Sequence, residues 1–411
     1  MASLNLTSFD AALKQHYTRD RVENMVYARN PLMAMLPKME RFGGKNLPIP
    51  IIYGNPSGRS AKFSAAQNNK NPSQITDFVL TRDHDYGLAS IDNETLLASQ
   101  GDSEAFMEAA TTEIDGTMHA VTRSAAKSLY RDGSGAIARL GNASFATTAM
   151  TLADTSDVVN FEVNMEIQFS SDATFGNIRD SGAALTVTAV NRRTGAITVG
   201  ANLSTISGIA QNDYISPEGD LEEGMIKGLD AWIPETVTAT SFFGVDRTAD
   251  ASRLAGQYED LSSLPIEEAL VEATSQIEQE GGAPDYVFMN FPNLSNLKKA
   301  LGSKVVYQQV EARAREANVG FKGVMIDGNA KPIVVLGDQN APNNFFYELT
   351  IETDGADVWK LYSLGMCPQI LDSDGLKMLR ESSSDGVELR VGYYAQLGCR
   401  APGWSGKFKI N

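Results

Sequence analysis

Apolar residues recur with the period of a helix over one long stretch of the chain. From residue 103 to residue 131 they are spaced three or four apart, which places them on one face of an amphipathic helix. That face comprises Phe106, Ala110, Ile114, Met118, Val121, Ala125 and Leu129. The spacing predicts a helix of about 28 residues, roughly 42 Å long. It ends at a strong helix breaker, Asp132-Gly133-Ser134-Gly135.

Two β-like segments before this helix flank a polar stretch. The first covers residues 47–53, and the second covers residues 75–88. Residues 55–74 between them are rich in Gly, Ser, Asn and Ala but also hold Lys62 and Phe63. This order predicts a long hairpin whose tip is too polar to pack on itself. An extended hairpin is only marginally stable in water, so we expect it to need a partner surface.

The first 45 residues have the composition of an arm rather than of a domain. Pro31 and Pro37 exclude a long helix, although a short helix fits residues 19–29. The scattered apolar residues, Met33 and Leu36 among them, cannot form a core of their own. We therefore expect them to lie on another surface.

Short alternating segments predict an all-β block between residues 145 and 222. Segments 185–190 and 196–199 flank a polar turn that ends in glycine, which is typical of a hairpin. Residues 161–167 alternate in the same way. A small barrel is one arrangement that fits this block.

Helices and strands alternate in the last third of the chain. A helix is predicted to begin at Pro265 and to end at Gly281. The strands and the short helix expected after it cover residues 286–289, 294–301, 333–336 and 387–397. The mixture of segregated helical and β segments predicts the α+β class.

Composition narrows the classes of protein that fit. At 411 residues, with 42% hydrophobic and 21% charged residues, the chain is long enough for two or three ordinary globular domains. The formal net charge of −16 argues against nucleic-acid binding driven by phosphate contacts. An acidic protein can still enclose nucleic acid, because like charge keeps the polymer from binding to the wall. A net negative charge that only aids solubility explains the composition equally well. Two cysteines without metal-ligand spacing indicate a reducing cytoplasm, and we find no signal peptide or apolar run of membrane-spanning length.

Residues suited to catalysis are few. Of the three histidines, His84 lies between Asp83 and Asp85 on a β-like segment, where neighbours face opposite sides and cannot close around one metal ion. We interpret it as a solvated surface histidine. Residues 323–328 have the glycine spacing of a phosphate loop but lack the Lys-Ser/Thr that follows it. The sequence therefore nominates no catalytic residue, no cofactor and no metal site, and predicts that the chain is not an enzyme.

The order of these parts resembles the major capsid proteins of tailed bacteriophages, with the Hong Kong 97 (HK-97) fold. The order is mixed arm, long hairpin, long helix, β insertion, α/β part and long closing strand. The stretches that are similar to that family are Asn30-Pro31, Gly43-Gly44, Pro48-Ile49, Tyr53-Gly54, Ser60-Ala61-Lys62-Phe63, residues 228–234 and residues 284–290.

The resemblance implies a division of the chain into the family's parts. The N-terminal arm is expected at 1–45, the extended loop hairpin at 46–95, the β insertion at 145–222 and the axial domain at 283–380. The peripheral domain with its spine helix is expected at 96–144, 223–282 and 381–411. Contacts between subunits are expected at the hairpin tip and arm, through Arg59, Lys62, Phe63, Met33 and Leu36. No covalent cross-link through Lys62 is expected.

The resemblance also implies partners and a location. Many copies of the chain are expected to form pentamers and hexamers of an icosahedral shell that encloses double-stranded DNA without reading its sequence. No room for the family's fused scaffolding segment precedes residue 46, so a separate scaffolding protein is expected, along with a portal protein; a cleaved precursor would look the same. Whether a decoration protein binds the β insertion stays open. The shell is expected to assemble in the host bacterial cytoplasm, with no membrane partner.

Gly116 interrupts the long helix, where glycine costs about 1 kcal/mol relative to alanine. In the resembling family the spine helix is bent in the immature shell, so Gly116 is a candidate hinge during maturation. Close packing of another chain against a residue without Cβ explains it equally well.

Three other functions remain open at this point. A nanocompartment shell of the encapsulin type shares the fold. A phage tail or adhesin protein accounts for the β block but not for the long helix. A hydrolase with an unrecognised site is the enzymatic alternative.

Overall fold

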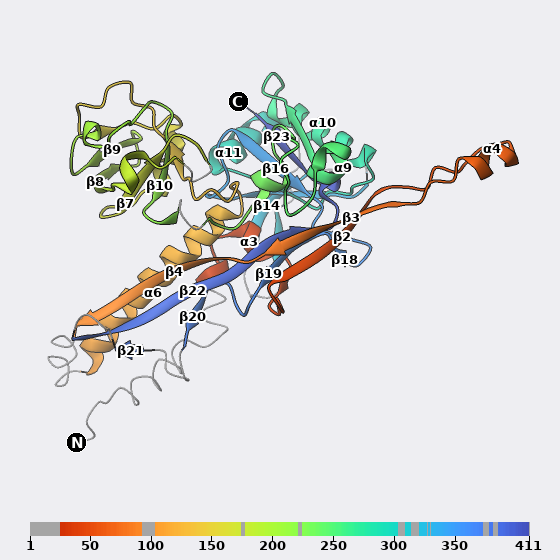
Figure 1. Ribbon diagram of the computed structural model, residues 1–411. Coiled ribbons are helices and arrows are strands. Elements are labelled where there is room, and N and C mark those ends of the chain that lie inside the picture. Colours follow the sequence, from red (N-terminus) through yellow and green to blue (C-terminus); the bar gives the residue numbers. More distant parts are fainter. Residues whose placement is uncertain are drawn as a thin grey trace. The chain divides into compact units, whose positions relative to one another are not determined.

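The computed structural model contains two compact units. It describes residues 25–92, 103–173, 177–220, 224–302, 309–313, 320–326, 328, 330–372, 378–380 and 385–410. Unit 1 combines the described residues up to Leu129 with those from Trp232 onward, and unit 2 comprises Tyr130–Ala231. Figure 1 shows both units in sequence colours.

A mixed sheet built around one long strand forms the first part of unit 1. The long strand is β22 (Gly386–Cys399), and it pairs antiparallel with four other strands of the sheet. These are β4 (Asp83–Asp92), β19 (Trp359–Ser363), β20 (Gln369–Leu371) and β21 (Met378–Arg380). The prediction of a closing strand over residues 387–397 is confirmed, with extra residues at both ends.

Helix α6 (Ser103–Ser128) covers one face of this sheet. A Cβ placed on Gly87 of β4 would lie 2.6 Å from a methyl carbon of Val121, so helix and strand are in close contact. Of the predicted apolar stripe, Ile114, Met118, Val121, Ala125 and Leu129 are all buried. The side chains of Phe106 and Ala110 lie outside the described residues. The long helix is confirmed, and Figure 1 shows it running alongside β4 and β22.

The second part of unit 1 is a seven-stranded sheet with helices packed against it. Its strand order is β11 (Gln257–Asp260), β23 (Gly406–Lys409), β16 (Phe345–Leu349), β12 (Tyr286–Met289), β15 (Ile333–Gly337), β14 (Gly320–Ile326) and β13 (Gln309–Arg313). Helices α10 (Ile266–Gln279) and α11 (Phe291–Leu301) contribute to its core. The predicted strands β12 and β15 and both predicted helices are confirmed. Helix α11 begins three residues earlier than expected, because Pro292 in its first turn is compatible with a helix start.

The sheets cut across the boundary that was expected at residues 282 and 283. Strand β11 and helix α10, which precede it, belong with the seven-stranded sheet. Strands β19, β20 and β21, which follow it, pair with β22 instead. Pairing between segments so far apart in sequence depends on tertiary packing, which local patterns do not report.

The arm is part of the fold of unit 1 from residue 25 onward. Helix α3 (Pro31–Met35) is buried along its whole length, and β1 (Lys38–Met39) pairs with β19. Met33 is 1% exposed and Leu36 is fully buried. The prediction that these two side chains lie on another subunit is therefore wrong, because their own chain covers them. Most of the helix expected at 19–29 lies outside the described residues.

Unit 2 is a small β-barrel. Its sheet has the order β5 (Ala138–Arg139), β10 (Tyr214–Pro217), β7 (Glu166–Ser170), β8 (Leu185–Asn191), β9 (Ala196–Val199) and β6 (Ala149–Met150). Beyond the two end strands the chain closes the ring. Gly141 N–H donates to the Thr151 carbonyl and Ala153 N–H donates to the Arg139 carbonyl, both at 2.8 Å. Closure leaves the barrel without an open sheet edge.

Apolar side chains fill the barrel of unit 2, and the most deeply buried include Phe161, Ile167, Phe169, Val187, Leu203 and Ile215. The predicted hairpin at 185–199 is confirmed as β8 and β9. The strand expected over 161–167 is wrong in its first half, because Asn164 has φ 69°, a left-handed conformation that a strand cannot contain. The β block expected at 145–222 lies inside this unit, which extends beyond it at both ends.

Candidate assembly surface

A hairpin projects from unit 1, and its two strands are β2 (Asn46–Gly54) and β3 (Gln74–Thr81). They pair antiparallel from Asn46 opposite Thr81 to Ile52 opposite Ile75. Figure 1 shows the short helix α4 (Phe63–Asn68) at the far end of this hairpin. The predicted hairpin is confirmed, but its second strand is shorter than expected.

The chain leaves the hairpin at Arg82. The Arg82 guanidinium donates to the Phe42 carbonyl at 2.9 Å and lies 5.0 Å from the centre of the Phe42 ring. Residues after Arg82 form β4, which pairs with β22 rather than with β2. The expected continuation through Tyr86 and Leu88 therefore belongs to a different sheet.

The root of the hairpin is fixed to the body of unit 1. Ile49, Ile51, Phe78 and Leu80 are all 4% exposed or less. The Phe78 ring meets the Trp232 ring edge-on, with 5.1 Å between centroids. This apolar burial determines where the hairpin starts.

Hydrogen bonds to the hairpin backbone set the direction in which the hairpin leaves the body. On one strand, the Arg253 guanidinium donates to the Tyr53 carbonyl at 2.9 Å. On the other, Val79 N–H donates to the Phe243 carbonyl at the same distance. Both strands are therefore held at the root, although by single hydrogen bonds.

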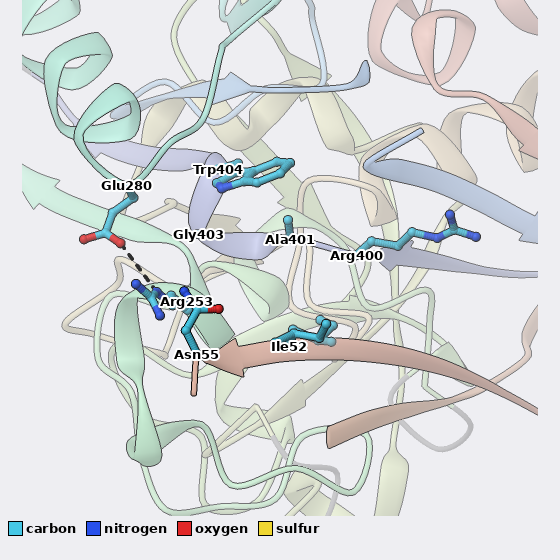
Figure 2. A pocket seen from close by; sticks show the side chains of 9 residues that line it. Ile52, Asn55, Arg253, Glu280, Arg400, Ala401, Gly403 and Trp404 are labelled. Carbon is cyan, nitrogen blue, oxygen red and sulfur yellow. Dashed lines mark ion pairs between the residues drawn. The ribbon is translucent and has the colours of Figure 1, made fainter. Parts of the chain in front are cut away.

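A pocket of about 210 Å³ lies beside this root, and Figure 2 shows the residues that line it. Arg253 and Glu280 face each other there with 3.8 Å between nitrogen and oxygen. Ile52, which is 62% exposed, and Trp404 supply apolar surface. The pocket thus combines an ion pair with exposed apolar surface at the base of the hairpin.

The tip of the hairpin, residues 55–74, is exposed. Helix α4 has no buried residue, and Phe63 is 82% exposed. The tip contains Arg59, Lys62 and Lys70 and no acidic residue. Among the described residues, none forms an ion pair with these three cations. An aromatic side chain and three unpaired charges thus extend into solvent together.

The structure brings three of the predicted contact residues together and separates the others. Arg59, Lys62 and Phe63 lie within five residues at the tip, while Met33 and Leu36 are buried elsewhere in unit 1. Gly116 lies on the exposed side of α6, where a Cβ would meet no atom of the described residues within 4 Å. Neither hinge motion nor packing by another chain is tested by this geometry, and both stay predictions.

An aromatic group on the first sheet was missed by sequence reasoning. On the face of the sheet opposite α6, the Tyr86 and Tyr394 hydroxyls are 2.8 Å apart, and this hydrogen bond raises the pKa of Tyr86 to about 12. The His84 ring lies 5.2 Å from that of Tyr86. His84 is therefore half-buried between aromatic rings rather than simply solvated. With Leu88 60% exposed beside them, the group forms a second uncovered apolar surface, which the alternation of β4 could have indicated.

Buried titratable groups in unit 1 serve packing. Asp85 faces α6, where burial raises its pKa and a hydrogen bond from Ser124 opposes that effect. Glu348 of β16 is fully buried, burial raises its pKa to about 8, and it accepts a hydrogen bond from Thr274 of α10 at 2.8 Å.

No group of metal-ligating side chains occurs among the described residues. None of the helices in that part of the chain is both long and apolar enough to cross a bilayer.

The similarity of this chain to known proteins is found in their structures. No protein-family model matches the sequence, and no curated protein matches it. A chain from the capsid asymmetric unit of cyanophage A-1(L) superposes with a TM-score of 0.53 at 12% identity, over 95% of both chains. The chain has the HK-97 capsid fold, in the α+β class.

Two further structures are similar at lower scores. The capsid of a native GTA particle matches at 10% identity and a TM-score of 0.44, over 92% of this chain and 89% of the other. The SrpI encapsulin complex from Synechococcus elongatus PCC 7942 matches at 8% identity and a TM-score of 0.45, over 100% and 97%. The assignment of the HK-97 fold rests on the cyanophage structure.

Proposed function

We propose that the chain is a major capsid protein, which assembles with copies of itself into the icosahedral shell of a tailed bacteriophage. One observation supports this beyond the fold. The hairpin root is firmly packed, yet its tip presents Phe63 and three cations that its own chain leaves uncovered. A folded chain gains nothing from such a tip unless a further surface covers it.

Assembly follows from the way this surface is built. Each tip contact is small, but a closed lattice repeats it many times, so weak contacts act together. Pentamers and hexamers of the chain are the expected units of that lattice. The proposed role is structural, and it requires no catalytic residue and no cofactor.

The parts of the family are proposed for this chain, but the axial and peripheral domains are assigned here by sheet and not by the bounds expected from the sequence. The hairpin β2–β3 corresponds to the extended loop and α6 to the spine helix. The seven-stranded sheet with α10 and α11 corresponds to the axial domain, and the sheet around β22 to the peripheral domain. The barrel of unit 2 corresponds to the β insertion.

The partners are proposed on the same basis. A separate scaffolding protein and a portal protein would take part in assembly in the host bacterial cytoplasm. Double-stranded DNA would be enclosed in the virion capsid without sequence-specific contacts, in keeping with the net charge of −16. A decoration protein on unit 2 remains an open partner.

Electron microscopy of the full chain tests this proposal directly. The protein is expressed alone and together with the neighbouring phage-type genes, and the particles are imaged. Closed icosahedral particles, tubes or broken shells are expected, and DNA inside particles from infected cells separates a virion from a compartment filled with protein. A discrete monomer or small oligomer under both conditions would overturn the proposal.

A further inference from the structure

The hairpin tip has a chemical counterpart on the same chain, on helix α10. No lysine, arginine or histidine occurs between Arg253 and Lys298, whereas this stretch contains many acidic residues. The stretch includes α10, whose buried face packs into the core of the seven-stranded sheet. Its outer face is therefore acidic and has no basic residue within the helix to neutralise it.

The outer face of α10 also exposes apolar surface. Val271 is 61% exposed and Leu264, just before the helix, is 37% exposed. Glu268 and the half-buried Glu267 lie three and four residues before Val271, which makes them its neighbours on the helix, and the exposed Glu272 follows it. We call Val271 with these three glutamates the acidic α10 face. In the part of the chain that the structure describes, no ion pair involves any of the three glutamates.

Helix geometry alone explains only part of this arrangement. Glu267 and Glu268 lie in the first turn of α10, where negative charge is favoured by the helix dipole. Glu272 lies beyond that turn, and the dipole gives no reason for an exposed valine beside it. Unpaired acids around an exposed apolar side chain complement a partner that carries positive charge and an apolar group.

We propose that the acidic α10 face of one copy of the chain receives the hairpin tip of a second copy. This inference rests on the proposed function, because it names the acceptor for the tip within the shell. Arg59, Lys62 and Lys70 supply the charge that the glutamates lack, and Phe63 supplies an aromatic side chain to cover Val271. Opposite charges select this pairing and guide its orientation, while the apolar contact supplies most of the stability.

The uncovered aromatic surface on the first sheet fits the tip less well. The face around Tyr86 and Leu88 carries the ion pair between Arg390 and Glu388, so its charges are already balanced. A tip with three cations and no anion gains little from such a surface. The acidic α10 face is the better match because its charges are of one sign.

Cross-linking between copies tests the contact. A chain with both Ser64→Cys and Ser275→Cys, which are exposed positions beside Phe63 and one turn from Val271, is assembled into shells and treated with a short bifunctional maleimide, and the products are separated on a denaturing gel. A ladder of linked chains is expected. Each single variant serves as the control, since the native Cys367 and Cys399 are buried. Shells that form normally but give no ladder would overturn the inference.

Charge exchange provides a second test. Reversal of the tip charges (Arg59→Glu with Lys62→Glu) should lower the yield of shells about tenfold, because like charges then face each other. Reversal on α10 (Glu268→Lys with Glu272→Lys) should have the same effect, and the two pairs together should restore assembly. The matched control is Arg193→Glu with Glu218→Lys in unit 2, which changes exposed charges that belong to neither surface and should leave the yield unchanged.

The two proposals fail in different ways. If the unmodified chain forms no shells under any condition, the proposed function fails. If it forms shells, but the combined charge exchange assembles no better than either pair alone, only the acceptor is wrong. Circular dichroism of each variant confirms that the chain is folded before assembly is scored.

Discussion

The barrel of unit 2 and the hairpin of unit 1 are both small sheets, but they differ in how far they bury their own apolar side chains. The barrel closes its ring through Gly141 and Ala153 and buries its own core, of which Phe169 is fully buried. The hairpin buries only its root and leaves Phe63 82% exposed. The comparison shows that one chain can combine a β unit that is complete by itself with one that needs a partner.

The largest effect on stability is expected in the barrel core. Phe169→Ala should lower the free energy of unfolding of the full chain by about 3–5 kcal/mol, because it removes a buried ring and leaves a cavity. Chemical denaturation followed by circular dichroism measures this. A change below about 1 kcal/mol would mean that the barrel collapses around the gap, and that its buried core is not what makes it stable by itself.

Glu348 is expected to have the next largest effect, and one that depends on pH. Its pKa in the folded chain is raised to about 8 from an ordinary 4.5, so the folded state holds the proton more tightly than the unfolded state does. Stability should therefore fall as pH rises from about 4.5 through 8 and level off above that.

Glu348→Gln tests this directly, since the amide keeps the acceptor for Thr274 but cannot ionise. At pH 8 the variant should be more stable by up to about 4 kcal/mol, and the difference should vanish near pH 4. Denaturation midpoints across that pH range give the answer. The exposed Glu218→Gln is the control, and a parallel pH dependence in both chains would contradict the assignment.

Gly116→Ala is expected to have a smaller effect of opposite sign to a core deletion. The position is helical and exposed, and an added Cβ meets no described atom, so stability should rise by about 0.5–1 kcal/mol. The rate at which shells expand reports on the hinge. Normal assembly and expansion in the alanine variant would exclude Gly116 as the soft point of α6.

The smallest effect on the isolated chain is expected at the tip. Phe63→Ala should change the free energy of unfolding by less than about 0.5 kcal/mol, because the ring is not packed on its own chain. The yield of shells should nevertheless drop sharply. Light scattering during assembly measures this, with the exposed Val163→Ala in unit 2 as the matched control. A tip variant that assembles normally would show that the exposed ring has no partner.

Elements defined by local period were predictable from the sequence, whereas their pairing was not. The apolar spacing that ends at Leu129 predicted α6, and the alternation before and after Asn191 predicted two strands of the barrel. The pairing of Lys38 with Leu361 joins segments that share no local signal, so the burial of the arm could not be foreseen. Ring closure in the barrel depends on isolated hydrogen bonds outside the strands, which also have no local signal in the sequence.

The candidate site was predicted in part. Arg59, Lys62 and Phe63 could be found because a polar stretch between β-like segments must form a hairpin tip. The acceptor surface could not, since Val271 reads as one apolar position of an amphipathic helix until the buried face is known. Exposure of a single side chain is a property of the packed molecule.

The register shift between Ile52 and Gly54 gives the projecting hairpin a pivot. A β-bulge at this point bends the strand just beyond the packed root. The chain from Gly54 to Phe63 can extend up to about 30 Å, so a swing of roughly 10° at the bulge would move the tip by about 5 Å. Subunits that meet at different angles could then keep the same tip contact with their neighbours, because the bulge and not the tip would absorb the change in curvature.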